Sequence, residues 1–206
     1  MLHYQCYLNR DMADAKTIAK LRAQTGAGMM DCKKALDEAK DDYEQAIIFL
    51  RKRGEAKANK KIDERDTKEG IVYAYIHTSN KSGAMIELLC ETDFVARTDD
   101  FKALAHDIGM QIVAMSPEYL KPEDVPDEII EKEKDIYREQ LKKEGKPEEM
   151  IEKILTGKLD KFYQEVCLLK QPFIKEDKMS MEELMKQMIA KTGEKMEIGN
   201  FSNFRI

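Results

Sequence analysis

The hydrophobic pattern of residues 17–54 predicts three short amphipathic helices. Apolar residues recur at helical spacing in each segment, and Thr25–Gly28 separates the first helix from the second. Gly54 follows the basic stretch Arg51–Arg53, which is typical of the end of a helix. Three helices of this length bury little surface, so the unit is only marginally stable alone. The third helix carries its apolar stripe at Tyr43, Ala46, Ile47 and Leu50.

The periodicity changes from helix-like to strand-like at Gly70. Residues 55–69 hold one large apolar residue, Ile62, among many charges, and we expect a linker or a solvated helix there. Beyond it, two β-branched and aromatic runs flank the turn Ser79–Gly83 and predict an antiparallel hairpin of strands. An amphipathic helix follows over residues 99–115, with Asp99 available as its N-cap. A helix packed on a β-hairpin makes an α+β layer.

A highly charged segment, residues 123–170, predicts an antiparallel helical hairpin. Gly145 ends its first helix and Pro147 begins its second, the usual placement of these two residues. The apolar content is low for a buried hairpin, so we expect it to project or to lie across a surface. A helix near residues 181–189 and a strand over residues 195–206 complete an α+β core that begins at residue 70.

The composition narrows the class of protein. The chain has 206 residues and is 42% hydrophobic, which is enough to bury a core, and its net charge of −5 argues against a generic nucleic-acid binder. The basic residues between Arg51 and Lys61 could touch phosphates, but such a run is more often a solvated helix face. No apolar run approaches the roughly 20 residues that span a bilayer, and the start of the chain does not resemble a secretory signal. We therefore expect a cytoplasmic protein with no membrane or direct nucleic-acid contact, and treat residues 1–16 as a tail in which Met12 could be the native start.

A search for catalytic chemistry finds little. The four cysteines are far apart and lack the short spacing of zinc sites or small disulfide frameworks, so we expect reduced thiols and no bound metal. The chain has no GxSxG, no HExxH and no Gly-rich phosphate loop, and Gly26–Gly28 lacks the third glycine of a dinucleotide fingerprint. The sequence predicts a protein that is not an enzyme and needs no cofactor.

Two short stretches look suited to recognition. Met29 and Met30 are neighbours at a Gly-rich turn, and since adjacent helical side chains diverge by about 100°, we expect one in the core and one exposed. Asp93 and Phe94 lie between the second strand and the helix that follows it. From the pattern alone, the favoured interpretation is that Phe94 fills the core and Asp93 caps a turn.

Three stretches together resemble translation elongation factor Ts, the guanine-nucleotide exchange factor of elongation factor Tu. They are LRAQTGAGMMDCKKAL at Leu21–Leu36, CETDFVAR at Cys90–Arg97, and the coiled-coil segment and its return at Glu144–Asp177. Each motif is specific, and their order and spacing agree with the family over most of the chain. The resemblance implies a ubiquitin-associated-like three-helix domain over residues 17–54, a linker over 55–69, and an α+β core over 70–206 with an antiparallel sheet and a projecting helical hairpin.

The resemblance also implies a partner and a set of contacts. In the family the TDFV segment dislodges the Mg²⁺ that elongation factor Tu binds with GDP, and it corresponds here to Thr92, Asp93, Phe94 and Val95. His77, in the strand hairpin, is a further candidate for approaching the partner. The N-terminal signature, which docks on the same partner, supplies Leu21, Thr25, Gly26, Ala27, Gly28, Met29 and Met30.

The chain also departs from the family pattern. Many members have a duplicated core, whereas this chain carries one, so the resemblance implies compensation by pairing into a homodimer. Gly199 and Asn200 stand where the family often has a basic pair in the last strand, which weakens a dimer built through that strand. The alternative hypothesis is a non-catalytic helical adaptor, since the N-terminal unit alone has the pattern of a small binding module. An adaptor would not need the Cys90–Arg97 motif or the charged hairpin.

Overall fold

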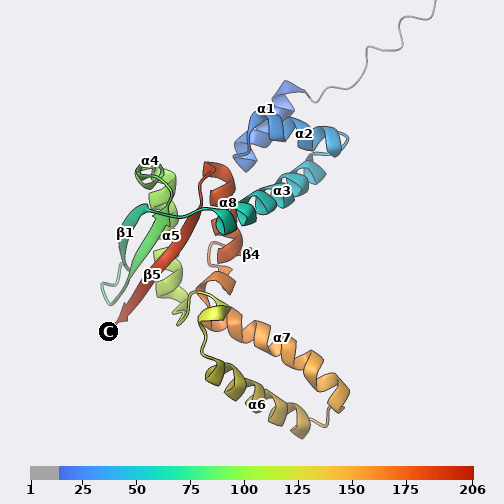
Figure 1. Cartoon of the computed structure of the whole chain (residues 1–206), viewed down its shortest axis with the longest axis vertical. Helices are drawn as coiled ribbons and strands as arrows, with labels where there is room; N and C mark the ends of the chain where they lie inside the picture. Colours follow the sequence, from blue (N-terminus) through green and yellow to red (C-terminus); the bar gives the residue numbers. More distant parts are fainter. Residues whose placement is uncertain (1–13) are drawn as a thin grey trace, which may run out of the picture. The chain divides into compact units, whose positions relative to one another are not determined.

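The computed structural model describes residues 14–206 and shows an α+β protein of helices and an antiparallel sheet (Figure 1). The chain divides into two compact units. One contains the described residues up to Arg65 together with Lys186–Lys195, and the other contains Asp66–Met185 with Met196–Ile206. Most of the expected tail lies outside the described residues, and its last two positions, 15 and 16, already belong to a helix.

The first unit is built on the three predicted helices: α1 (Ala15–Thr25), α2 (Met29–Glu38) and α3 (Tyr43–Glu64). Gly26 ends α1 in the left-handed conformation, with φ of 68°, and its N–H donates to the carbonyl of Arg22. The Asp42 carboxylate caps α3 by accepting from the N–H of Gln45 at 3.0 Å. Seven buried side chains from α1, α2 and the first half of α3 form one cluster: Ile18, Leu21, Cys32, Ala35, Leu36, Ala46 and Leu50. Its likeness to ubiquitin-associated domains stays a prediction.

The expected end of the third helix at Gly54 is wrong. Helix α3 passes through Gly54 and continues to Glu64, so most of the predicted linker is helical. A glycine costs a helix only about 1 kcal/mol relative to alanine, and an Arg51–Glu55 ion pair of 3.2 Å spans this position. The extension is also packed, because Ala58 is fully buried and a Cβ on Gly54 would lie 3.3 Å from the Cβ of Ala190. Packing in the unit therefore overrides the local stop signal.

The second unit contains an antiparallel sheet with the strand order β1-β2-β5. Its strands are β1 (Glu69–Ile76), β2 (Ser82–Cys90) and β5 (Met196–Arg205). The turn between the first two strands places Asn80 at a positive φ of 56°, and the register pairs Tyr73 with Ile86. This confirms the predicted antiparallel sheet.

Gly199 and Asn200, the residues of the last strand that depart from the family pattern, lie at a bulge opposite Glu87. The register between β2 and β5 shifts between Ile86 and Leu88. A Cβ on Gly199 would lie 2.5 Å from a carboxylate oxygen of Glu87, and the Asn200 side-chain amide donates to the same oxygen at 3.0 Å. A larger residue at position 199 would therefore displace the Glu87 side chain.

Helix α5 (Asp99–Met115) covers one face of this sheet. Its N-cap is Thr98, whose hydroxyl accepts from the N–H of Phe101 at 3.3 Å, and not Asp99 as expected. Thr98 has the extended backbone that an N-cap requires, whereas Asp99 is already the first helical residue. Gly109 allows close contact with the sheet, because a Cβ there would lie only 2.6 Å from the Cβ of Tyr75.

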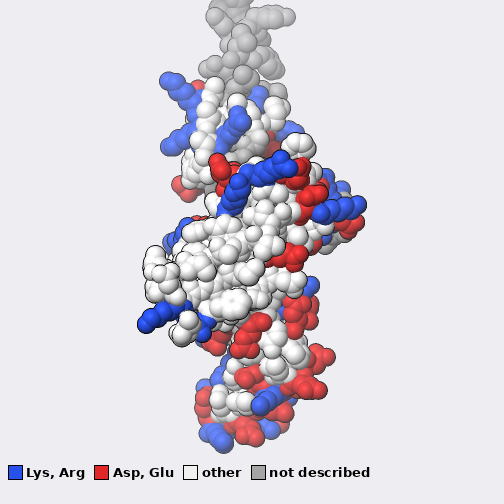
Figure 2. All heavy atoms as spheres, turned by 90° about the vertical axis from the view of Figure 1, so that its left-hand side faces the viewer, with Lys and Arg blue, Asp and Glu red and all other residues white. Residues whose placement is uncertain are grey.

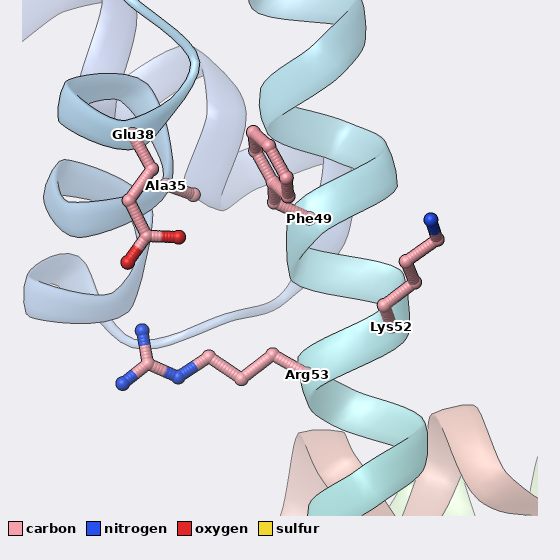
Figure 3. Close-up of a pocket in the computed structure, with 5 residues that line it drawn as sticks. All are labelled: Ala35, Glu38, Phe49, Lys52 and Arg53. Atoms are coloured by element: carbon pink, nitrogen blue, oxygen red, sulfur yellow. The ribbon is translucent and has the colours of Figure 1, made fainter.

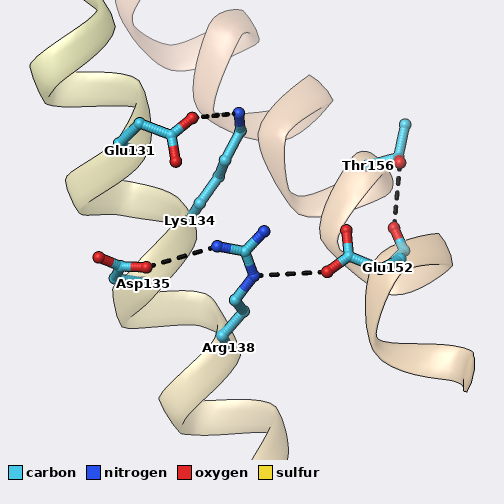
Figure 4. Close-up of polar contacts among 6 residues, drawn as sticks. All are labelled: Glu131, Lys134, Asp135, Arg138, Glu152 and Thr156. Atoms are coloured by element: carbon cyan, nitrogen blue, oxygen red, sulfur yellow. Dashed lines mark hydrogen bonds and ion pairs between the residues drawn. The ribbon is translucent and has the colours of Figure 1, made fainter. Parts of the chain in front are cut away.

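The predicted helical hairpin consists of α6 (Asp127–Lys143) and α7 (Glu148–Val166) and projects from the sheet-bearing part of its unit (Figure 1). Gly145 turns the chain with φ of 71°, and Pro147 stands at the N-cap of α7. Three buried side chains, Leu141, Ile151 and Leu155, form most of its interior. The two helices are also joined by Arg138, which pairs with Asp135 and reaches across to Glu152, each at 3.4 Å (Figure 4).

The 3₁₀ turns η1 (Pro122–Asp124) and η2 (Leu168–Lys170) flank the hairpin in the chain. The remaining elements are the single turn α4 (Asp93–Ala96) between β2 and α5, the two-stranded pair β3 (Pro172–Phe173) and β4 (Glu176–Ser180), and helix α8 (Met181–Thr192). Among the described residues, no helix combines the length and the apolar composition that crossing a membrane would require.

Candidate partner-binding surface

The TDFV segment occupies the junction between β2 and α5. Strand β2 ends at Cys90, Thr92 is the N-cap of α4, and Thr98 begins α5 shortly afterwards. The buried Cys90 thiol donates to the carbonyl of Thr92 at 3.2 Å, and the Thr98 hydroxyl donates to the carbonyl of Val95 at 2.8 Å. These bonds hold both ends of a helix that is too short to be stable by itself.

Phe94 is exposed on this turn. Its side chain is 82% accessible, so the interpretation that it fills the core is wrong. Ala96 is the buried residue of α4 instead. Two positions along a helix differ by about 200°, so when Ala96 faces the sheet, Phe94 must face outward. An exposed phenylalanine on a well-anchored turn is a ready contact for another protein.

The Asp93 carboxylate has an exchangeable partner within the chain. It pairs with Arg97, one helical turn later, at 2.9 Å, and both side chains are substantially exposed. Exposed pairs at this spacing contribute only about 0.3–0.5 kcal/mol, so the carboxylate can change partners at little cost. Asp93 can therefore accept a hydrogen bond from a docked molecule beside Phe94.

The glycine-rich stretch of the first unit forms a compact turn between α1 and α2. The Thr25 hydroxyl donates to the Leu21 carbonyl at 2.7 Å and accepts from the N–H of Ala27 at 3.3 Å. The Leu21 side chain is fully buried, so it supports the turn from inside and does not present an apolar surface. Ala27 is partly buried against the same cluster, and Gly28 is the N-cap of α2.

Both methionines at this turn face solvent. Met29 is 51% exposed and Met30 is 65% exposed, so the expectation that one would enter the core is wrong. They are the first two residues of α2, and the buried positions of that helix are Cys32, Ala35 and Leu36. The pair forms a soft apolar surface of the kind that adapts to binding partners.

His77 does not lie near the TDFV segment in this chain. It follows the end of β1, where its Nδ1 lies 2.9 Å from the Ser79 hydroxyl, and its side chain is exposed. The register pairs Ile76 with Gly83 at this end of the hairpin and Glu69 with Cys90 at the other. The two candidate contacts are thus separated by the length of an eight-residue strand, roughly 25 Å.

A pocket that the sequence did not predict lies between α2 and α3. Its volume is about 350 Å³, and Ala35, Glu38, Phe49, Lys52 and Arg53 line it (Figure 3). Phe49 provides an apolar wall, the Glu38 carboxylate and the Arg53 guanidinium lie on the α2 side of α3, and the Lys52 side chain points away from them (Figure 3). The lining contains no Ser, Thr, Cys or His side chain. Exposed residues spaced along two helices give no periodic signal that would have identified it.

The titratable groups of the described residues also offer no catalytic centre. No three His, Cys, Asp or Glu side chains among residues 14–206 are grouped as metal ligands would be. The thiols of Cys32, Cys90 and Cys167 are buried. Burial raises the pKa of Cys32, and it raises the pKa of Cys167 to about 11 with help from the nearby Asp124 carboxylate. Thiols with raised pKa values are poor nucleophiles at neutral pH.

Comparison with known proteins gives one consistent result. The family model described as elongation factor TS matches residues 12–206. Elongation factor Ts of Thermosipho melanesiensis is 54% identical over 195 residues, covering 95% of this chain and 99% of that protein. The same factor from Fervidobacterium nodosum is 53% identical (93% and 97% covered), and that from Thermotoga maritima is 51% identical (92% and 94% covered). This chain belongs to the elongation factor Ts family.

Proposed function

We propose that this chain is the guanine-nucleotide exchange factor of elongation factor Tu, acting in translation elongation. It promotes release of GDP by displacing the bound Mg²⁺, and it stays associated until GTP binds. The observation that carries the proposal is Phe94, an 82% exposed aromatic residue in the family's TDFV motif, on a turn anchored at both ends. The exchange needs no covalent step.

The mechanism uses the strict geometry of magnesium. Mg²⁺ requires nearly ideal octahedral oxygen ligands at 2.0–2.1 Å, so a small shift of one ligand-bearing segment weakens its binding. Phe94 enters the partner as a wedge and moves such a segment. Asp93 leaves Arg97 and accepts hydrogen bonds from the displaced segment, while Thr92 and Val95 shape the turn around the ring.

Thermodynamic linkage completes the cycle. If the bound factor weakens GDP binding by a certain ratio, GDP must weaken binding of the factor by the same ratio. An incoming nucleotide therefore displaces the factor, and GTP completes the exchange. The chain accelerates dissociation and is itself unchanged.

The turn from Thr25 to Met30 supplies a second contact with the same partner. The exposed side chains of Met29 and Met30 provide its apolar part, and the hydrogen-bonded Thr25 and the left-handed Gly26 hold its shape. Leu21 contributes through packing only, because its side chain is fully buried.

A homodimer supplies the missing second core. The sheet face opposite α5 exposes apolar side chains around Met85, with Glu87 also on it, and the side of the molecule that carries the strands shows an extensive uncharged surface (Figure 2). In such a dimer, the second copy would bring its His77 to the complex with elongation factor Tu. Within each copy, His77 and Phe94 lie at opposite ends of the strand hairpin. The exposed apolar residues of this face are Val72, Ile76, Met85 and Phe204.

The dimer is tested by light scattering coupled to size-exclusion chromatography. We expect twice the chain mass for the native protein and the mass of one chain for Met85→Glu, since the glutamate would lie in the middle of the apolar face. A native protein that elutes with the mass of one chain at micromolar concentration would rule out this dimer.

The exchange function is tested by release of a fluorescent GDP analogue from elongation factor Tu, chased with excess GDP. The release rate should rise with the concentration of this chain, and the acceleration should weaken as Mg²⁺ is raised. If a folded preparation leaves the rate unchanged with a cognate partner, exchange is excluded and the adaptor hypothesis replaces it.

A further inference from the structure

Two glutamines are the buried polar side chains of the described chain. Gln111, in the second half of α5, and Gln171, after η2, both have no accessible surface. Burying an amide without hydrogen bonds is costly, so the partners of these two groups show what they connect.

The two amides satisfy each other and the surrounding backbone. The Gln111 amide nitrogen donates to the Gln171 side-chain oxygen and to the Pro172 carbonyl, each at 3.1 Å. The Gln111 oxygen accepts from the N–H of Ile174 at 3.0 Å, and the Gln171 amide nitrogen donates to the Glu165 carbonyl at 3.0 Å. The pair therefore ties α5 to the last turn of α7 and to the chain around β3.

This network lies at the base of the helical hairpin. The chain entering the hairpin and the chain leaving it are paired there, with the Leu168 N–H donating to the Tyr119 carbonyl at 2.9 Å and the Tyr119 N–H donating to the Val166 carbonyl at 3.0 Å. Helix α7 has 19 residues and is therefore about 28 Å long. A rotation of 10° at the base would move the tip by about 5 Å, so small changes in the base alter what the hairpin can reach.

Helix α5, which contains Gln111, also follows directly on the TDFV segment in the chain. Helix α5 begins directly after α4 and Thr98, and Gln111 lies three turns further along. Helix α5 thus connects the turn that carries Phe94 to the Gln111–Gln171 pair at the base of the hairpin. The pair also holds three backbone groups, the Ile174 N–H and the Pro172 and Glu165 carbonyls, so replacing both amides by leucine should loosen the base of the hairpin. A hydrogen-bonded polar network of this kind selects one geometry.

We propose that Gln111 and Gln171 are positioning residues that hold the hairpin in a fixed direction relative to Phe94, so that the hairpin contacts elongation factor Tu while the wedge is inserted. This inference rests on the exchange function proposed above. The hairpin offers Ile136 and Met150 as exposed apolar contacts among its charges. The proposed wedge at the Mg²⁺ site is Phe94 on α4, so we expect the hairpin contact to contribute to binding and not to the maximal rate of GDP release.

The test compares four forms of the protein in the GDP-release assay. They are the native chain, the double substitution Gln111→Leu/Gln171→Leu, a short-hairpin form in which a Gly-Ser turn replaces residues 134–157, and a form that combines the double substitution with the short hairpin. Each is measured over a range of concentrations to separate the half-saturating concentration from the maximal rate. The double substitution should raise the half-saturating concentration at least fivefold and leave the maximal rate within twofold. The short-hairpin form should show the same rise, and the combination should show no further rise. Gln187→Leu, at an exposed position of α8, is the matched control and should change neither value.

The outcomes separate the two proposals. If the native chain does not accelerate release, the exchange function fails. If it does, but shortening the hairpin leaves the half-saturating concentration unchanged, the hairpin makes no contact and the inference fails. It also fails if the glutamine substitutions still weaken binding when the hairpin is short, because they then act through another part of the molecule. Should the double substitution not fold, the short-hairpin form alone decides whether the hairpin binds.

Discussion

Truncation of Phe94 should separate binding from folding. A phenylalanine side chain buries about 200 Å² when fully covered, so with 82% of it exposed, only about 40 Å² is buried within this chain. At about 25 cal/mol per Å², Phe94→Ala should cost about 1 kcal/mol of folding free energy, or a few degrees in Tm. The remaining area, about 160 Å², is available to a partner, and burying it would contribute at most about 4 kcal/mol to the free energy of binding.

Truncation of an aromatic interface residue to alanine typically reduces the binding free energy by about 2–4 kcal/mol. The efficiency of stimulated GDP release should therefore fall about 30- to 1,000-fold, since each 1.36 kcal/mol is tenfold. The assay is stopped-flow release of a fluorescent GDP analogue, with Tm measured on the same samples. Ile48→Ala, another exposed apolar position, serves as the control and should release GDP normally. A Phe94→Ala protein with a strongly reduced Tm and unchanged exchange per folded molecule would refute the wedge.

Three further predictions concern stability. Gly109→Ala should destabilise the sheet-bearing unit by about 1–3 kcal/mol and lower its Tm, because the new Cβ would lie 2.6 Å from that of Tyr75; an unchanged Tm would show that α5 can move away freely. Leu141→Ala should remove about 2–5 kcal/mol from the hairpin alone, seen as faster amide hydrogen exchange in α6 and α7 with unchanged exchange in the sheet. The pKa of Cys167 is raised by burial to about 11, so the folded protein holds this proton more tightly than the unfolded chain does. Its contribution to stability is complete below about pH 9 and is lost as the pH rises towards 11, and Cys167→Ala should reduce the pH dependence of urea denaturation in that range.

Local pattern was sufficient for the elements that are amphipathic along their whole length. The spacing of apolar residues reports which side of a helix or strand avoids water, so the strand hairpin, α5 and the paired helices α6 and α7 could be predicted. Gly145 and Pro147 marked the hairpin turn because their backbone preferences are intrinsic. The motif Cys90–Arg97 could be proposed as a candidate site because its residues are contiguous.

Other features depended on contacts between distant segments. Gly54 has the local signature of a helix end, but α3 continues because the residues beyond it are packed. Phenylalanine is an apolar residue type that is usually expected in the core. Only the burial of Ala96 against the sheet shows that the Phe94 side chain points outward. No local pattern could reveal this, since a single-turn helix is too short to have a recognisable period.

The amino-acid sequence by itself determined the α+β composition, the order of the elements, the family and the contiguous candidate motif. The tertiary structure decided which side chains of those elements are available to a partner. It placed His77 a strand length away from Phe94, and it brought together Gln111 and Gln171 across 60 positions of chain. The physical reason is that a sequence specifies which faces are apolar, whereas the partner of each face is selected by the packing of the whole fold.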